Sequence, residues 1–323
     1  MAAIHRLLTV CFAFAGATTH AETSGDFTYE VADHAVTITG YSKLAPGLAV
    51  IPATIAGNPV TAIGERAFRE CVKLTAVTIP ASVTAIEENA FVGCSSMAAV
   101  TIPSSVTSIG GGAFGVCTSL TAVTIPGSVT SIGDNAFYSC SLLTSITLSS
   151  GITSIGTAAL FGCKSLTAVT LPGSVASVGI EAFASCDSLV SIEVDSSNLK
   201  YSSLGGVFFN KNQTVIVAFP KGKGSAYSIP GGVTSIAEGA FSHSDNLTAV
   251  TLPETVITIG RFAFLGCTSL TSVPLPANIT AIGEKVFEGC KSLTAMTLPG
   301  GVTSIGNFAF RHTFRTPAVH FSV

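Results

Sequence analysis

Residues 74–94 read LTAVTIPASVTAIEENAFVGC, and residues 97–117 repeat the pattern as MAAVTIPSSVTSIGGGAFGVC. The Ile/Leu-Pro dipeptide serves as a ruler, because Pro80, Pro103 and Pro126 are each 23 residues apart. Ala-Phe pairs and cysteines recur at the same spacing along most of the chain. Several independent columns with one period indicate a repeat solenoid, in which each unit buries its apolar face only against its neighbours.

The order of residues within one unit predicts the path of one coil. Residues 74–79 end in alternating apolar and polar side chains, which is typical of a half-buried strand, and Pro80 ends that strand because it has no N–H to donate. Residues 83–86 predict a second short β stretch, and Ala90-Phe91 fits one helical turn that plugs the core. We therefore expect a mainly β solenoid, a right-handed coil with short strands and one helical turn per 23-residue unit.

The unit LTAVTIPxSVTSIGxxAFxxC resembles the BspA-like leucine-rich-repeat surface proteins, a subclass with 23-residue repeats. The resemblance covers about residues 51–311 in ten units, and residues 27–41 are similar to the short β segment that commonly precedes such repeats. It implies a leucine-rich-repeat fold and an exported or surface-displayed protein. It also implies a role in adhesion to host or matrix proteins and in cell–cell contact.

The two ends of the chain complete the expected domain organisation. Residues 1–21 predict a signal peptide, with a short apolar run and a small-x-small cleavage site after Ala21. Residues 22–50 are expected to form an N-terminal β cap, residues 51–311 the solenoid, and residues 312–323 an irregular C-terminal tail. No later stretch is long and apolar enough to predict a transmembrane helix, so we expect a secreted or cell-surface location.

The repeat is interrupted once, between Asp195 and Pro230, where the spacing of 35 residues equals one period plus 12. Residues at about 196–229 predict an inserted hairpin, and loops on a rigid scaffold often carry function. The insertion is therefore one candidate surface for partner binding, and the alternative is a structural interruption of the kind common in this family. Its basic and aromatic residues are Lys200, Tyr201, Lys211, Lys221, Lys223 and Tyr227.

A second candidate surface is a row of threonines predicted to point outward from the first strand of each unit. The row comprises Thr78, Thr101, Thr124, Thr147 and Thr170. One interpretation is β propensity alone, because branched hydroxyl residues suit exposed strand positions. A second is a flat, uncharged docking face for a protein or a glycan, and a third is a hydroxyl array that meets ice.

The cysteines form a column of their own, and eight of them follow residue 21. Export and an even number favour disulfides, and stacked coils would bring equivalent Cα atoms within disulfide range. Equivalent side chains point in the same direction, however, so we expect buried free thiols that pack as small hydrophobes. No C-x-x-C pair or accompanying histidine is present, so no metal site is predicted.

Composition and motif content argue against other functional classes. Charged residues make up 10% of the chain, the net charge is −3, and Lys and Arg are not clustered, so we expect no nucleic-acid partner. The chain has no catalytic motif, so we expect neither an enzyme nor a cofactor site. The expected function is a monomeric adhesion module that binds a host or matrix protein or a glycan. The alternative is a structural or self-associating envelope protein without a specific ligand.

Overall fold

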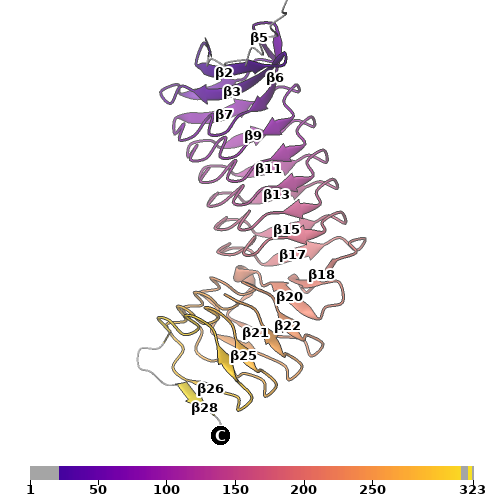
Figure 1. Cartoon of the computed structure of the whole chain (residues 1–323), viewed down its shortest axis with the longest axis vertical. Helices are drawn as coiled ribbons and strands as arrows, with labels where there is room; N and C mark the ends of the chain where they lie inside the picture. Colours follow the sequence, from indigo (N-terminus) through magenta and orange to yellow (C-terminus); the bar gives the residue numbers. More distant parts are fainter. Residues whose placement is uncertain (1–21, 314–318, 322–323) are drawn as a thin grey trace, which may run out of the picture.

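The computed structural model describes residues 22–313 and 319–321, and the expected signal peptide (residues 1–21) lies outside them. The chain winds into a β-solenoid of about 12 turns with almost no helix. Its coils stack into an elongated rod along which parallel strands form ladders (Figure 1). The predicted leucine-rich-repeat solenoid is confirmed.

The long strand of each coil forms the first ladder, where the sequence predicts it. Thr78 lies opposite Thr101, and Thr124 lies opposite Thr147, so one residue type fills one column of the ladder. Val77 is buried between the partly exposed Ala76 and the exposed Thr78, as the pleat of a half-buried strand requires. One continuous ladder comprises β4 (Gly47–Val50), β7 (Leu74–Thr78), β9 (Ala99–Thr101), β11 (Ala122–Ile125) and β13 (Ser145–Leu148), and a separate pair follows it, β15 (Ala168–Leu171) and β17 (Ser191–Val194).

The second ladder consists mostly of two-residue strands whose isoleucines point into the core. It comprises β6 (Asn58–Ile63), β8 (Ala85–Ile86), β10 (Ser108–Ile109), β12 (Ser131–Ile132), β14 (Ser154–Ile155) and β16 (Ser177–Val178). A glycine follows most of these strands because the coils approach closely there. A Cβ atom at Gly133 would lie 2.5 Å from the backbone nitrogen of Gly111.

An antiparallel meander covers the N-terminal end of the second ladder. Strand β3 pairs parallel with β6, and β2 and β1 follow outward from it in antiparallel order. A short fourth strand, β5, pairs antiparallel with β6 and lies outside the main strand order of the sheet. The bounds are β1 (Glu22–Ser24), β2 (Phe27–Ala32), β3 (Ala35–Tyr41) and β5 (Thr54–Ile55).

The inserted residues form a seam between two stacks of coils. Strand β19 (Val207–Asn210) pairs antiparallel with β18 (Tyr201–Leu204) on one edge and with β20 (Val215–Ala218) on the other. Phe208 belongs to the core of the preceding coils, whereas Val207 and Phe209 belong to a second core. We call residues 22–195 the N-terminal segment, residues 196–225 the seam, and the described residues from 226 onward the C-terminal segment. The rod bends at the seam (Figure 1).

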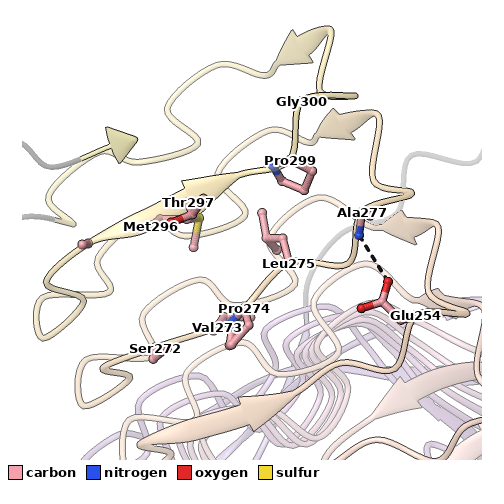
Figure 2. A pocket seen from close by; sticks show the side chains of 11 residues that line it. Glu254, Ser272, Val273, Pro274, Leu275, Ala277, Met296, Thr297, Pro299 and Gly300 are labelled. Atoms are coloured by element: carbon pink, nitrogen blue, oxygen red, sulfur yellow. Dashed lines mark hydrogen bonds between the residues drawn. The ribbon is translucent and has the colours of Figure 1, made fainter. Parts of the chain in front are cut away.

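The C-terminal segment repeats the two ladders in shorter pieces. Its long strands are β21 (Ala226–Ser228), β23 (Ala249–Thr251), β26 (Met296–Leu298) and β28 (Val319–Phe321), and its short strands are β22 (Ser235–Ile236), β24 (Thr258–Ile259), β25 (Ala281–Ile282) and β27 (Ser304–Ile305). Val319 lies opposite Met296, so part of the tail expected to be irregular (residues 312–323) keeps the 23-residue register. One coil has no long strand, and Pro274 stands at the centre of that gap (Figure 2).

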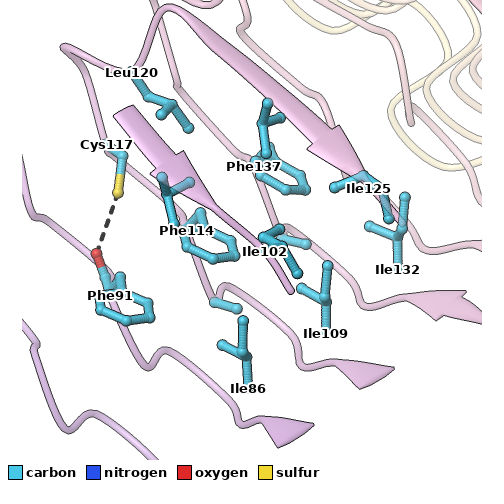
Figure 3. Close-up of a cluster of buried hydrophobic side chains, with 14 of the residues drawn as sticks. Ile86, Phe91, Ile102, Ile109, Phe114, Cys117, Leu120, Ile125, Ile132 and Phe137 are labelled. Atoms are coloured by element: carbon cyan, nitrogen blue, oxygen red, sulfur yellow. Dashed lines mark hydrogen bonds between the residues drawn. The ribbon is translucent and has the colours of Figure 1, made fainter. Parts of the chain in front are cut away.

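Phenylalanines of the Ala-Phe pairs stack through the centre of the rod. The rings of Phe91 and Phe114 are 5.3 Å apart and nearly parallel, and those of Phe114 and Phe137 are also 5.3 Å apart. All three rings are fully buried among the isoleucines of both ladders (Figure 3). Leu160 takes this slot in the next coil, and Phe183 follows it. The stack supplies the interior that no single coil could bury alone.

The segment around each Ala-Phe pair is a run of turns rather than the expected helical turn. Two positions per coil adopt left-handed backbone angles, for example Asn89 (φ 56°) and Gly93 (φ 75°) on either side of Ala90-Phe91. A right-handed helix cannot continue through such residues. Within the described residues the one helix is a short 3-10 turn, η1 (Lys221–Lys223), which lies in the seam.

Candidate functional site

The predicted threonine row forms an exposed surface on the N-terminal segment, which we call the threonine face. It comprises the outward side chains of β7, β9, β11, β13 and β15, and its threonines are Thr78, Thr101, Thr124, Thr147 and Thr170, all exposed. A shallow hollow of about 320 Å³ lies among Thr101, Thr124 and Thr147. No charged residue lines this hollow. The surface therefore presents methyl and hydroxyl groups without charge.

The hydroxyls of the threonine face differ from those of a second threonine row, Thr84, Thr107, Thr130 and Thr153, which directly precedes the short strands of the second ladder. Thr107 Oγ1 donates to the carbonyl of Thr84 at 3.2 Å, and Thr153 Oγ1 donates to that of Thr130 at 3.0 Å. These hydroxyls bond one coil to the next. Within the part of the chain that the structure describes, the five hydroxyls of the threonine face have no such partner. They remain able to bond to solvent or to a ligand.

The threonine face has a different boundary at each end. Toward the N-terminus, Leu48 and Val50 of β4 lie opposite Ala76 and Thr78, and both side chains are exposed. Toward the seam, Glu193 lies opposite Thr170. Its carboxylate accepts hydrogen bonds from Ser191 and Ser203, which lower its pKa below the ordinary value. The face thus runs from an apolar edge, through neutral coils, to an ionised carboxylate.

Lys221 lies inside the seam. It is 8% exposed, and its ammonium group is 2.7 Å from Asp187 Oδ1 and 2.8 Å from Asp245 Oδ1. Burial lowers the pKa of Lys221, but the hydrogen bonds and charges of the two aspartates outweigh that effect and raise it above its ordinary value. The three groups join the last coil before the seam to the first complete coil after it. Counting back two periods from Cys267 through Ser244 reaches position 221, so the repeat held a signal for this placement.

The structure distributes the other predicted residues of the insertion over separate sites. Tyr201 packs on Phe208 at 4.9 Å, as part of the N-terminal core. Tyr227 packs on Phe219 at 5.0 Å, in the C-terminal core. The ammonium group of Lys211 bonds the carbonyls of Ser196 and Asn198 in the same segment.

Lys200 and Lys223 are exposed, and within the described residues their side chains make no hydrogen bond or ion pair. The six residues of the insertion therefore do not form one cluster. Their basic and aromatic character at sequence level does not translate into one continuous patch, because four of the six side chains hold the seam together.

The cysteine column consists of buried free thiols. Cys117 Sγ donates to the carbonyl of Phe91, one coil earlier, at 3.3 Å (Figure 3), and the same bond recurs along the column. Burial raises the pKa of Cys94 and of Cys140 to about 12, so these thiols stay protonated at neutral pH and are poor nucleophiles. Among the described residues no group of three or more His, Cys, Asp or Glu side chains could hold a metal ion.

Within residues 22–313 and 319–321, no helix has the length and apolar character needed to cross a membrane.

The chain resembles known bacterial proteins over nearly its whole length. One solved structure, a leucine-rich cell surface protein of Faecalibacterium prausnitzii, is 29% identical, with a TM-score of 0.72 over 94% of this chain and 95% of that one. The pneumococcal vaccine antigen PcpA is 24% identical and shows the same fold, with a TM-score of 0.75 over 89% of this chain and 78% of that one.

No curated protein matches the sequence. The model of the BspA-type leucine-rich-repeat region matches residues 53–144, 130–222 and 217–322. Together these ranges include most of both segments and the seam between them. The chain therefore belongs to the BspA-type leucine-rich-repeat family.

Proposed function

We propose that the chain is an exported or cell-surface interaction module whose threonine face binds a host or matrix protein or a glycan. One observation carries the proposal: five exposed threonines recur every 23 residues on the long strands, four of them on one continuous ladder, and their hydroxyls have no partner among the described residues. Repeat solenoids commonly bind through such extended surfaces. The cell-surface relative from Faecalibacterium prausnitzii and the expected signal peptide in residues 1–21 support the location.

The chemistry of the threonine face suits contact over several coils rather than catalysis. Hydroxyl groups can donate to and accept from a partner, and the methyl groups of threonine and alanine add apolar area. The strands hold these groups in fixed positions, so little ordering is needed when a partner binds. The thiols of the column are buried and protonated, and we propose no catalytic role for the chain.

Binding of residues 22–323 to matrix proteins, host-cell surfaces and glycans tests the proposal, with two matched variants. Thr124→Lys places a charge in the hollow of the threonine face. Thr130→Lys makes the same change at an exposed position next to β12, in the second ladder. We expect saturable binding that Thr124→Lys abolishes and Thr130→Lys leaves intact. Equal binding by both variants would exclude the threonine face as the binding site.

The seam needs its own probe in the same experiment. Deleting the hairpin would remove Val207, Phe208 and Phe209 from both cores, so a loss of binding would be confounded with unfolding. Lys200→Glu combined with Lys223→Glu changes the two exposed lysines and leaves the cores unaltered. We expect this double variant to bind like the parent. Loss of binding would transfer the site to the insertion.

Self-association as a structural protein is the second candidate, and one observation favours it. Ile305 in β27 is 46% exposed, whereas Ile282, at the same position one coil earlier, is 1% exposed. An exposed apolar residue beside a strand edge is a place where another chain can add. Sedimentation velocity across the micromolar range decides between the two candidates: we expect a monomer, and concentration-dependent growth that Ile305→Lys abolishes would favour the structural role.

A further inference from the structure

The long-strand ladder breaks at a single coil of the C-terminal segment. Pro274 stands at the position that Thr251 and Thr297 fill in the neighbouring coils. A single isolated bridge, Ala249 to Ser272, links this coil to β23, and β26 pairs with β28 instead. Proline has no N–H and cannot donate to a ladder, so the strand is lost where the proline stands.

A hollow of about 490 Å³ opens over the broken coil (Figure 2). Its floor is apolar, because the buried residues Val273 and Met296 line it. Leu275 also lines it and is partly exposed, whereas Leu252 and Leu298, in the same column, are buried. The missing strand thus uncovers a side chain that belongs to the core in other coils.

The rim of the hollow carries one charge. Glu254 is exposed, and among the described residues its carboxylate accepts one hydrogen bond, a 3.4 Å contact from the backbone N–H of Ala277. No Lys, Arg or His is among the lining residues, so no cation within the hollow neutralises this carboxylate. No aromatic residue lines it either, so a sugar ring would find no flat ring to stack on. The hollow on the threonine face, by contrast, has no charged lining residue.

We propose that the hollow at Pro274 is an anchor site for a protein partner, which inserts one aliphatic side chain next to a Lys or Arg. The aliphatic group replaces water over Val273, Leu275 and Met296, and the cation pairs with Glu254. The inference rests on the proposed binding function and specifies the partner's chemistry. It places a second contact point on the C-terminal segment, apart from the threonine face.

Methionine methyl NMR tests the proposal directly, because residues 22–323 contain only Met97 and Met296. Met296 lines the hollow, and Met97 is fully buried in the N-terminal core, where it serves as the internal control. The probe is the peptide acetyl-Gly-Ser-Leu-Lys-Ser-Gly-amide, compared with versions carrying Leu-Glu or Ala-Lys at its centre. We expect the Leu-Lys peptide to shift Met296 saturably, with a dissociation constant of roughly 1–10 mM, because few atoms make contact.

Two variants separate the apolar part of the site from its charge. Pro274→Thr restores the repeat residue, and we expect the strand to close the hollow, to remove the Met296 shift and to raise the melting temperature. Glu254→Gln keeps the hollow, and we expect the preference for Leu-Lys over Leu-Glu to fall roughly two- to fivefold, the range of an exposed ion pair. Met97 should remain unshifted in every titration.

Three results would overturn the inference: no shift of Met296 with any peptide, an unchanged shift in Pro274→Thr, or a larger shift with glucose or N-acetylglucosamine than with the peptides. The outcome is independent of the test on the threonine face. Partner capture that Pro274→Thr leaves intact would retain the proposed function and reject this site. Peptide binding at Met296, without binding to any of the matrix proteins, host-cell surfaces or glycans, would retain this site and reject the proposed function.

Discussion

The N-terminal and C-terminal segments share the same 23-residue repeat, and the repeat is more regular in the N-terminal segment. The N-terminal segment has an uninterrupted cysteine column of six thiols, from Cys71 to Cys186, whereas the C-terminal segment has two, Cys267 and Cys290. The long strands of the N-terminal segment form a continuous ladder of five, β4 to β13, and one separate pair, β15 and β17, whereas those of the C-terminal segment occur only in pairs. Where the repeat is regular, each environment is dictated by the coils on either side. Where one residue departs, the consequence is local, as at Pro274.

Alkaline pH should separate the two segments most strongly. The buried thiols have folded pKa values above the ordinary 9.0, about 12 for Cys94, Cys140 and Cys186. The stability they contribute is complete below pH 9 and is lost as pH rises toward the folded values. Above pH 9 each such thiol lowers the free energy of unfolding by about 1.4 kcal/mol per pH unit. With six thiols against two, we expect the N-terminal segment to lose far more stability at pH 10.

Alkylation after exposure to increasing urea, read peptide by peptide with mass spectrometry, measures this difference. Cys117 reports the N-terminal segment and Cys267 the C-terminal segment in the same sample. At pH 10 we expect Cys117 to lose protection at a lower urea concentration, relative to pH 8, than Cys267 does. A matching shift at both cysteines would mean that the seam couples the segments into one cooperative unit.

Truncation of a stacked ring tests how far damage in one segment travels. Phe114 and Phe264 are both fully buried between two neighbouring rings. Changing either to alanine should lower the free energy of unfolding of its own segment by about 3–5 kcal/mol, because a cavity remains. The same alkylation experiment should show loss of protection at Cys267 for Phe264→Ala with Cys117 unchanged, and the converse for Phe114→Ala. Loss at both sites in both variants would contradict the separation into two cores.

Removing the ammonium group of the seam should weaken the link between the segments. Lys221→Met leaves Asp187 and Asp245 without their shared partner, and since both carboxylates are about half exposed we expect a loss of about 1–3 kcal/mol. The raised pKa means that this contribution is present below the ordinary lysine value of 10.5 and disappears only above it. Urea unfolding at pH 7 checks the loss. Asp245→Asn alone, which keeps one carboxylate, should lose less.

Exchanging residues at one left-handed position should give effects of opposite sign in the two segments. Val116 has φ 58°, which is unfavourable for a β-branched residue, and Gly266 fills the equivalent position with φ 68°. Val116→Gly should therefore stabilise the chain by about 1 kcal/mol, and Gly266→Val should destabilise it by about 1–2 kcal/mol. Melting temperatures measured for both variants test the sign. A destabilised Val116→Gly would show that side-chain packing outweighs the backbone strain.

Much of the fold was predictable because the period appears in columns that are independent of each other. The strands, the outward threonines and the place of the seam all follow from counting in steps of 23. The two threonine rows look alike in sequence, however, and only the structure separates the bonded hydroxyl of Thr107 from the unpartnered one of Thr124. That difference depends on where the next coil places a carbonyl, which a local pattern does not encode.

The residues that sequence reasoning placed wrongly or overlooked are those whose environment comes from distant coils. Counting from Cys267 marks the position of Lys221, but its partners Asp187 and Asp245 come from separate coils that a local pattern does not bring together. The helical turn expected at each Ala-Phe pair is replaced by turns with left-handed residues, which the Ala-Phe pattern by itself does not reveal. Pro274 lies next to the regular proline column at Pro276, so its effect on the ladder is visible only once the neighbouring strands are in place.

The hydrogen bond from each cysteine to the coil before it has an evolutionary consequence. Thr313 makes the same bond to Phe287, so a hydroxyl can replace the thiol as the donor. A family built on paired cysteines could gain or lose units only in numbers that leave no thiol unmatched. Here a single 69-nucleotide duplication would add one complete coil, one donor and one acceptor, and the chain could lengthen without any oxidative folding machinery.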